Sequence, residues 1–117
     1  MTRNDQIEIA RLAGHIDKSA AATSFSDHIT ECLGRNIRGF CLNLEGIEHI
    51  DSIGLGLLLS VMIRIKNVGG ALTLCCISDQ VMAVIHAAHL DMVFDFRPTE
   101  SEALHDLMQT VNHKLRI

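Results

Sequence analysis

The chain has 117 residues, of which 48% are hydrophobic and 21% are charged, so one compact core can form without disulfides or metal ions. Its net charge of −4, its scattered basic residues and its lack of Trp and Tyr argue against a nucleic-acid-binding protein. The longest apolar run, broken by Ser60 and Arg64, is too short for a membrane span, and the N-terminus lacks a secretory signal's apolar stretch.

The first half of the chain contains two strand patterns and one helix pattern. Branched apolar residues over residues 6–13 predict a strand that Gly14 ends. Asp17 can cap a following helix, and residues 39–44 alternate apolar and other side chains as a half-buried strand does. The helix is predicted from apolar side chains at helical spacing, which are Phe25, Ile29, Cys32 and Leu33.

Two further strand-like segments and a second helix pattern follow in the middle of the chain. Residues 47–50 are strand-like and lead into Asp51-Ser52, after which a helix extends to the stop signal Gly69-Gly70. The nearly all-apolar residues 71–77 predict a strand that is covered on both faces. The helix should bury an apolar stripe against the sheet, formed by Leu55, Leu58, Leu59 and Met62.

The last third of the chain repeats this alternation. Ser78 can open a third helix, residues 93–96 predict a short strand, and Thr99 with Glu102 forms a capping box for a terminal helix. That helix has an apolar stripe of Leu104, Leu107, Met108, Val111 and Leu115. We therefore expect an α/β fold: an open, mixed and mostly parallel sheet of four to five strands, flanked by about four helices, in one domain over residues 1–117.

Four cysteines occur without CxxC spacing, and the adjacent Cys75 and Cys76 would face opposite sides of a strand. Buried, reduced thiols in a cytoplasmic protein explain them best, so we expect cytoplasmic localisation. His86, His89 and His105 raise the question of a metal site. No acidic or cysteine partner has ligand spacing to them, so we interpret them as solvated side chains and expect neither metal nor cofactor.

The Asp51-Ser52 pair precedes the first turn of a predicted helix. The first N–H groups of a helix lack partners within it, and the helix dipole adds partial positive charge there, so a phosphate on Ser52 would meet an anion-binding site. Asp51 or Ser52 can equally be a simple N-cap. Ser52, Gly56, Ser60 and Ile63 share a stripe opposite the buried leucines, which suits either a partner surface or a loosely covered solvent face.

Residues 41–56, CLNLEGIEHIDSIGLG, resemble the STAS signature of bacterial anti-sigma factor antagonists. The likeness covers residues 7–104, and it includes Gly69-Gly70 and residues 14–17, which look like the family's Gly-Glu-Leu-Asp segment. Ile53 differs from the family, which often has a second small residue at this position.

The resemblance implies a regulatory binding protein of the STAS fold and not an enzyme. Members bind an anti-sigma factor that is also a serine kinase, and thereby free a sigma factor. The kinase phosphorylates the serine after the motif aspartate, here Ser52, which dissociates the complex, and a PP2C-type phosphatase resets the switch. We expect the partner to bind at Asp17, Asp51, Ser52, Gly54, Leu55, Gly56, Ser60 and Ile63.

One other functional class remains open on the sequence. A STAS domain can also be a structural subunit that docks without being phosphorylated, in a lipid-transport ABC complex or in a scaffold for stress signalling. The retained Asp51-Ser52 and Gly54-Leu55-Gly56 favour the phosphorylation-switched antagonist.

Overall fold

The computed structural model describes the backbone of residues 7–16 and 20–115 and the side chains of residues 7–14 and 24–110. Four strands in this part of the chain form one sheet in the order β1-β2-β3-β4, and every neighbouring pair is parallel. The elements in chain order are β1 (Ile7–Ile16), α1 (Ala20–Gly34), β2 (Gly39–Ile50), α2 (Ser52–Asn67), β3 (Ala71–Cys75), α3 (Asp79–Ala87), β4 (Asp95–Arg97) and α4 (Glu100–Leu115). The predicted α/β class is confirmed.

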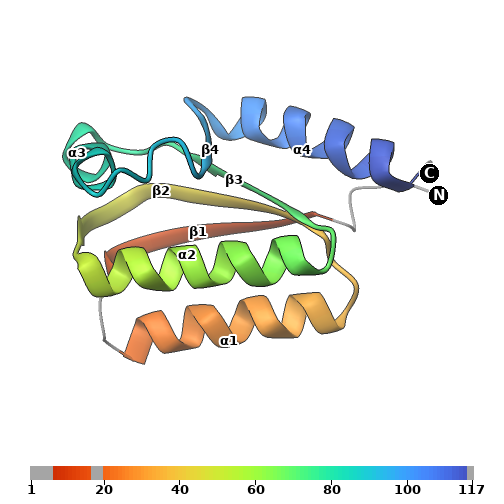
Figure 1. The fold of residues 1–117 in the computed structure, drawn as a ribbon, viewed down its shortest axis with the longest axis horizontal. Coiled ribbons are helices and arrows are strands. Elements are labelled where there is room, and N and C mark those ends of the chain that lie inside the picture. Colours follow the sequence, from red (N-terminus) through yellow and green to blue (C-terminus); the bar gives the residue numbers. More distant parts are fainter. Residues whose placement is uncertain (1–6, 17–19, 116–117) are drawn as a thin grey trace.

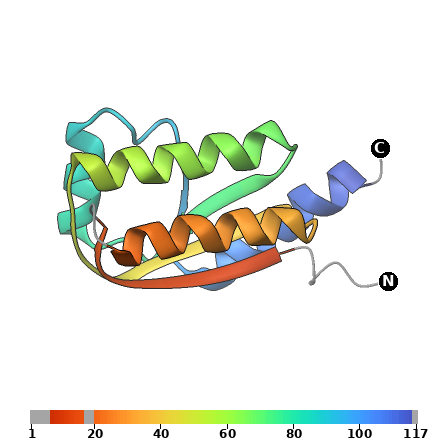
Figure 2. The ribbon, with the colours of Figure 1, turned by 90° about the horizontal axis from the view of Figure 1, so that it is seen from below.

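The helices cover the sheet from two sides. In Figure 1, α1 and α2 lie below the sheet, α4 lies above it, and α3 lies at one end. Seen from below in Figure 2, α1 and α2 are side by side across the same face. Because parallel strands need a crossover between them, α1, α2 and α3 each connect two strands, and α4 follows β4 and packs on the opposite face from α1 and α2.

The α1–α2 face contains the larger apolar core. Alternate residues of β2 point toward these helices, so Phe40, Leu42 and Leu44 are fully buried there. The predicted stripe of α2 meets them: Leu55, Leu58 and Met62 are buried, and Leu59 is partly buried against the same cluster. The facing that the sequence predicted for α2 is confirmed.

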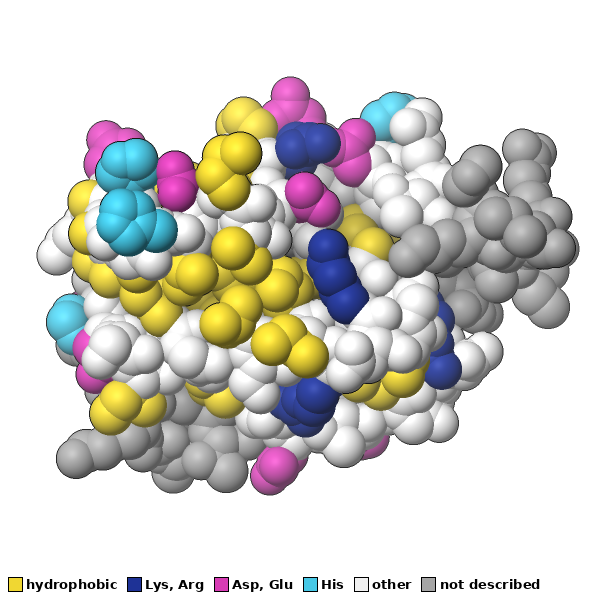
Figure 3. All heavy atoms as spheres, viewed as in Figure 1, with side chains coloured by type: hydrophobic (Ala, Val, Ile, Leu, Met, Phe, Trp, Pro, Cys, Tyr) yellow, Lys and Arg dark blue, Asp and Glu magenta, His cyan; other side chains and the backbone are white. Residues whose placement is uncertain are grey.

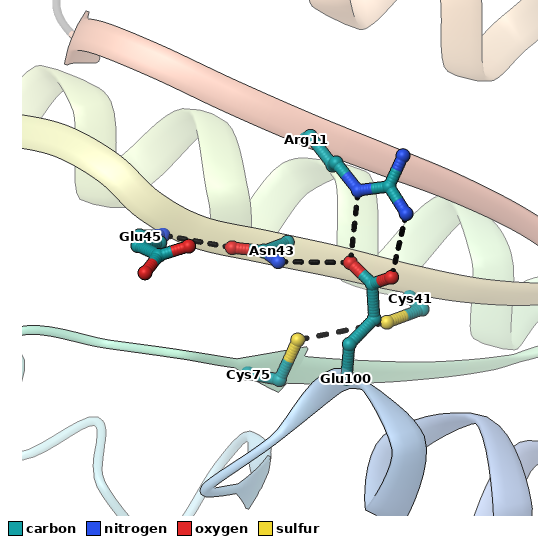
Figure 4. Close-up of polar contacts among 6 residues, drawn as sticks. All are labelled: Arg11, Cys41, Asn43, Glu45, Cys75 and Glu100. Carbon is teal, nitrogen blue, oxygen red and sulfur yellow. Dashed lines mark hydrogen bonds and ion pairs between the residues drawn. The ribbon is translucent and has the colours of Figure 1, made fainter.

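The α4 face combines a small apolar cluster with a polar network. Cys41, Cys75, Ala103 and Leu107 are buried together, and the Sγ atoms of Cys41 and Cys75 are 3.7 Å apart. The Arg11 guanidinium donates two hydrogen bonds to Glu100, and Asn43 Nδ2 donates to the same carboxylate at 2.8 Å (Figure 4). This network ties the start of α4 to β1 and β2.

Two strand boundaries and one core residue differ from the sequence-based expectations. Gly14 does not end β1. It has a φ of +88°, lies where the register with β2 shifts, and the strand continues to Ile16. Strand β4 covers Asp95–Arg97 and not residues 93–96, since Thr73, Leu74 and Cys75 of β3 pair with these three residues. Met108, which we expected in the core, is 37% exposed; Val111 and Leu115 lie outside the described side chains.

The expectation of buried thiols holds for three of the four cysteines, and Cys76 follows the end of β3 instead of lying in the strand. Cys32, Cys41 and Cys75 are buried free thiols, and Cys76 is partly exposed. Within the described part of the chain, no helix combines the length and apolar character that crossing a membrane requires.

Candidate functional site

The start of α2 holds the residues that the sequence singled out. Asp51 is the N-cap: its backbone is extended, and its Oδ1 accepts a hydrogen bond from the Gly54 N–H at 2.8 Å. Its carbonyl oxygen accepts the Leu55 N–H at 2.9 Å. The cap that the sequence left open between two residues is therefore Asp51.

Ser52 is the first residue of α2, and its side chain is exposed. Its hydroxyl makes no hydrogen bond to any other residue that the structure describes, since Asp51 already caps the helix. The first turn of α2 contains no acidic residue. An anion on the Ser52 oxygen would thus lie at the positive end of the α2 helix dipole, beside the capping Asp51 carboxylate.

The predicted outward stripe of α2 does face solvent. Ser52, Gly56 and Ser60 are exposed, and Ile63 is 48% exposed. A Cβ at Gly56 would have no heavy atom within 4 Å, so the fold itself does not require glycine there. Glycine inside a helix costs roughly 0.5–1 kcal/mol relative to alanine. Gly56 therefore lowers the stability of α2 at an exposed position.

The other expected contact residues are placed differently. Gly54 and Leu55 are buried residues of the first turn of α2. The Leu55 side chain is only 6% exposed and packs in the core. The packing of the Leu55 side chain holds the first turn in place, and contact of Gly54 and Leu55 with a partner stays a prediction. Asp17 lies outside the described residues.

Part of the exposed apolar surface was not predicted from the sequence. Ile53 is 53% exposed beside Ser52, and the segment after α3 exposes 91% of Met92 and 39% of Val93. Figure 3 shows hydrophobic side chains gathered across the middle of the face that carries α2 and α3. The available signal was Met92, which lies between the third predicted helix and the strand predicted over residues 93–96 and belongs to neither apolar pattern.

The predicted solvated histidines are exposed. His86 Nδ1 lies 2.9 Å from a carboxylate oxygen of Asp91, and this contact lowers the pKa of Asp91. His105 is within 3.1 Å of Gln109 Nε2, and His89 has a positive φ of 60°. The three rings do not converge on one point in any described cluster of possible metal ligands.

Comparison with known proteins places the chain in a family. Residues 1–103 match the family model described as the STAS domain. A Thermotoga neapolitana protein named as an anti-sigma factor antagonist homolog is 30% identical over 77 residues, which cover 66% of this chain and 68% of that protein.

Solved structures share the fold. The crystal structure of a Thermotoga maritima anti-sigma factor antagonist has a TM-score of 0.80 and 24% identity, and the match covers 88% of each chain. The anti-sigma factor antagonist SpoIIAA in its unphosphorylated form has a TM-score of 0.68 and 22% identity, with 91% of this chain and 90% of that chain covered. The phosphorylated form of Bacillus SpoIIAA has a TM-score of 0.69 and 23% identity, with 91% and 95% covered. With its sequence match and its fold in agreement, the chain belongs to the STAS domain family.

Proposed function

We propose that this chain is an anti-sigma factor antagonist that binds an anti-sigma factor through the start and outward stripe of α2, and that phosphorylation of Ser52 ends this binding. The observation that carries the proposal is that Asp51, and not Ser52, caps α2. Asp51 caps the helix, which leaves the exposed Ser52 hydroxyl without a structural role. A kinase can therefore modify Ser52 without breaking a hydrogen bond that stabilises the fold.

Relatives support the same reading. The Thermotoga neapolitana relative is named for this activity, and a protein of the same fold, SpoIIAA, has been solved in unphosphorylated and phosphorylated forms. We propose that the partner is an anti-sigma factor with serine kinase activity, and that a PP2C-type phosphatase removes the phosphate. The protein then regulates transcription in the cytoplasm as a binding protein and not as an enzyme.

The proposed switch follows from charge and solvation. A phosphoserine adds about −1.5 to −2 charges at neutral pH, and its oxygens must lose water in any close interface. At position 52 the phosphate suits the helix start, but it lies next to the Asp51 carboxylate and the exposed Ile53. The folded domain tolerates the phosphate, whereas an apolar or acidic partner surface over α2 does not.

The test of the switch is phosphorylation by the cognate anti-sigma kinase and ATP, read by mass spectrometry. We expect one phosphate on Ser52 and none on the Ser52→Ala variant, which should keep nearly all its thermal stability because Asp51 provides the cap. Ser52→Asp should fold but lose partner binding. Ser60→Ala, an exposed serine two turns further along α2, is the matched control and should still be phosphorylated.

Phosphate on Ser60, or none from a kinase that is active on another antagonist, would overturn the switch. The chain would then be the unphosphorylated structural STAS subunit, and its binding to the partner would be the same with Ser52 or Asp at this position.

The proposed docking surface has its own test. Ile63→Asp places a charge at the C-terminal end of the outward stripe and should weaken partner binding by at least about tenfold, because a buried unpaired carboxylate is costly in an interface. Met108→Asp is the matched control, since Met108 is also partly exposed but lies on α4, across the sheet. Equal loss of binding in both variants, or loss of folding in Ile63→Asp, would place the partner elsewhere.

A further inference from the structure

A second group of reactive side chains lies between β1 and α1, and the proposed function does not use it. Glu8 comes from β1, and His28 and Cys32 come from consecutive turns of α1. The Nε2 atom of His28 lies 2.7 Å from Glu8 Oε2 and 3.6 Å from Cys32 Sγ. The spacing of four residues puts the imidazole and the thiol on one helix face, directed at the edge strand.

Both contacts are made by the same ring nitrogen. In a catalytic relay the acid and the nucleophile bind opposite nitrogens of the histidine, so that a proton can pass through the ring. Here the carboxylate, the imidazole nitrogen and the thiol instead converge on one point. Their ligand atoms all lie within 4.8 Å of one another. Among the described residues, no other group of three or more His, Cys, Asp or Glu side chains has this geometry.

The three donors are one sulfur, one nitrogen and one oxygen, which are the ligand types that Zn²⁺ takes in proteins. Zn–ligand bonds of about 2.0–2.3 Å would place ligand atoms between about 3 and 4 Å apart in a tetrahedron, so small side-chain rotations suffice. We propose that Glu8, His28 and Cys32 form a binding site for a divalent transition-metal ion, with Zn²⁺ as the expected ion and water as the fourth ligand.

Burial leaves the site one open side. Cys32 is fully buried, whereas the side chains of Glu8 and His28 are 25% and 43% exposed. An ion can therefore enter from solvent past the partly exposed imidazole, and solvent water would complete its coordination. The thiolate and the carboxylate together match the double positive charge of the ion, so the loaded site carries no net charge.

Two features of the surroundings oppose loading of the site. Burial raises the pKa of the Cys32 thiol, so the ion must displace its proton. Arg35 Nη2 also lies 3.5 Å from Cys32 Sγ. The Arg35 side chain is 56% exposed and its Nε is 4.0 Å from Glu31, so the guanidinium can turn toward that carboxylate when the thiolate binds a metal.

The experiment titrates the untagged, reduced protein with Co²⁺ and then displaces Co²⁺ with Zn²⁺. We expect one Co²⁺ per chain, visible d–d bands of a tetrahedral site and a near-ultraviolet thiolate-to-cobalt band, all lost on adding Zn²⁺. His28→Gln, Glu8→Gln and Cys32→Ser should each weaken Co²⁺ affinity by at least about tenfold. Zn²⁺ should also raise the Tm of the wild-type chain by joining β1 to α1, and should not do so for His28→Gln.

Cys76→Ser is the matched control. Cys76 is the partly exposed cysteine, and it directly follows the last residue of β3 and is not part of α1. This variant should bind Co²⁺ as the wild type does. Circular dichroism checks that each variant is folded, and Glu8→Gln leaves the buried core untouched if Cys32→Ser fails to fold. The proposal is overturned if the thiolate band survives in Cys32→Ser, disappears in Cys76→Ser, or is absent from the wild type. None of these outcomes depends on the partner or on Ser52.

Discussion

The helices on the two faces of the sheet are held by different kinds of interaction. On one face α1 and α2 pack through a large, almost wholly apolar cluster in which Leu58 and Ile65 of α2 are fully buried. On the other face α4 packs through a small cluster of two thiols, Ala103 and Leu107, and a charged network joins its first turn to β1 and β2.

Because the two faces are held by different interactions, α2 and α4 should respond differently to substitution and to pH. Apolar packing fixes α2 along most of its length, so its outward stripe is a rigid surface on which a partner can dock. The attachment of α4 depends more on polar groups, which respond to charge and pH. Variants on each face should therefore differ in the size of their effect and in its dependence on pH.

The largest effect is expected on the apolar face. Leu58→Ala removes a fully buried side chain and leaves a cavity, which should lower the free energy of unfolding by about 3–5 kcal/mol. Urea denaturation measures this loss. Leu57→Ala, at the partly buried neighbouring position, should cost clearly less. Equal losses for the two variants would contradict the facing of α2.

A smaller loss is expected when the α4 network is opened at its centre. Asn43 is 8% exposed, donates to Glu100 and accepts a hydrogen bond from the backbone N–H of Glu45 at 2.9 Å. Asn43→Ala removes both bonds and should lower the free energy of unfolding by about 1–3 kcal/mol. Glu48→Ala, an exposed change on the same strand, should have almost no effect. A loss as large as that of Leu58→Ala would remove the distinction between the faces.

The smallest loss in the free energy of unfolding at neutral pH is expected when Glu100→Gln removes the carboxylate charge. The size of this loss should depend on pH. Hydrogen bonds from Arg11 and from Asn43 lower the pKa of Glu100 in the folded chain. Because the folded pKa is depressed, the ionised carboxylate stabilises the fold above the ordinary glutamate pKa of about 4.3, and this contribution is lost as pH falls through the folded pKa. The stability difference between wild type and Glu100→Gln should therefore shrink below about pH 4.

Glu102→Gln is the control for this experiment, since Glu102 is also in the first turn of α4 but is exposed. Urea midpoints at several pH values should show no comparable pH-dependent difference for Glu102→Gln. The cost of Leu58→Ala should vary little over the same range. If the Glu100→Gln difference grew as the pH fell, the network would not stabilise the fold through the ionised carboxylate.

The sequence predicted the apolar face better than the polar one, for a physical reason. Apolar periodicity places Leu58 inward and Ile63 outward from neighbours within two helical turns, and the structure agrees on both. The ion pair between Arg11 and Glu100 joins residues 89 positions apart, so no local pattern could indicate it. The same holds for the Cys41–Cys75 contact, which joins two strands.

The candidate site was predictable to the same extent. A helix start at Ser52 follows from the cap residues before the apolar stripe, and the exposed stripe follows from helical spacing. The sequence left open which residue caps the helix, because Ser and Asp do so equally well; backbone geometry decided for Asp51. The sequence predicts a strand end at Gly14 because glycine usually weakens strands, whereas in the structure Gly14 lies at a register shift within β1.

The register of the sheet has a consequence for how the chain folds. Ile7 pairs with Gly39, and Gly39 pairs with Ala71, so each pairing joins residues separated by a whole helix and its two connections. No described pair of neighbouring strands can form as a hairpin, and the sheet therefore cannot grow by zipping between residues close in sequence. High contact order of this kind slows folding relative to a helical bundle of the same length. Until β2 has been synthesised, β1 has no strand to pair with, and the emerging chain exposes an unpaired strand edge.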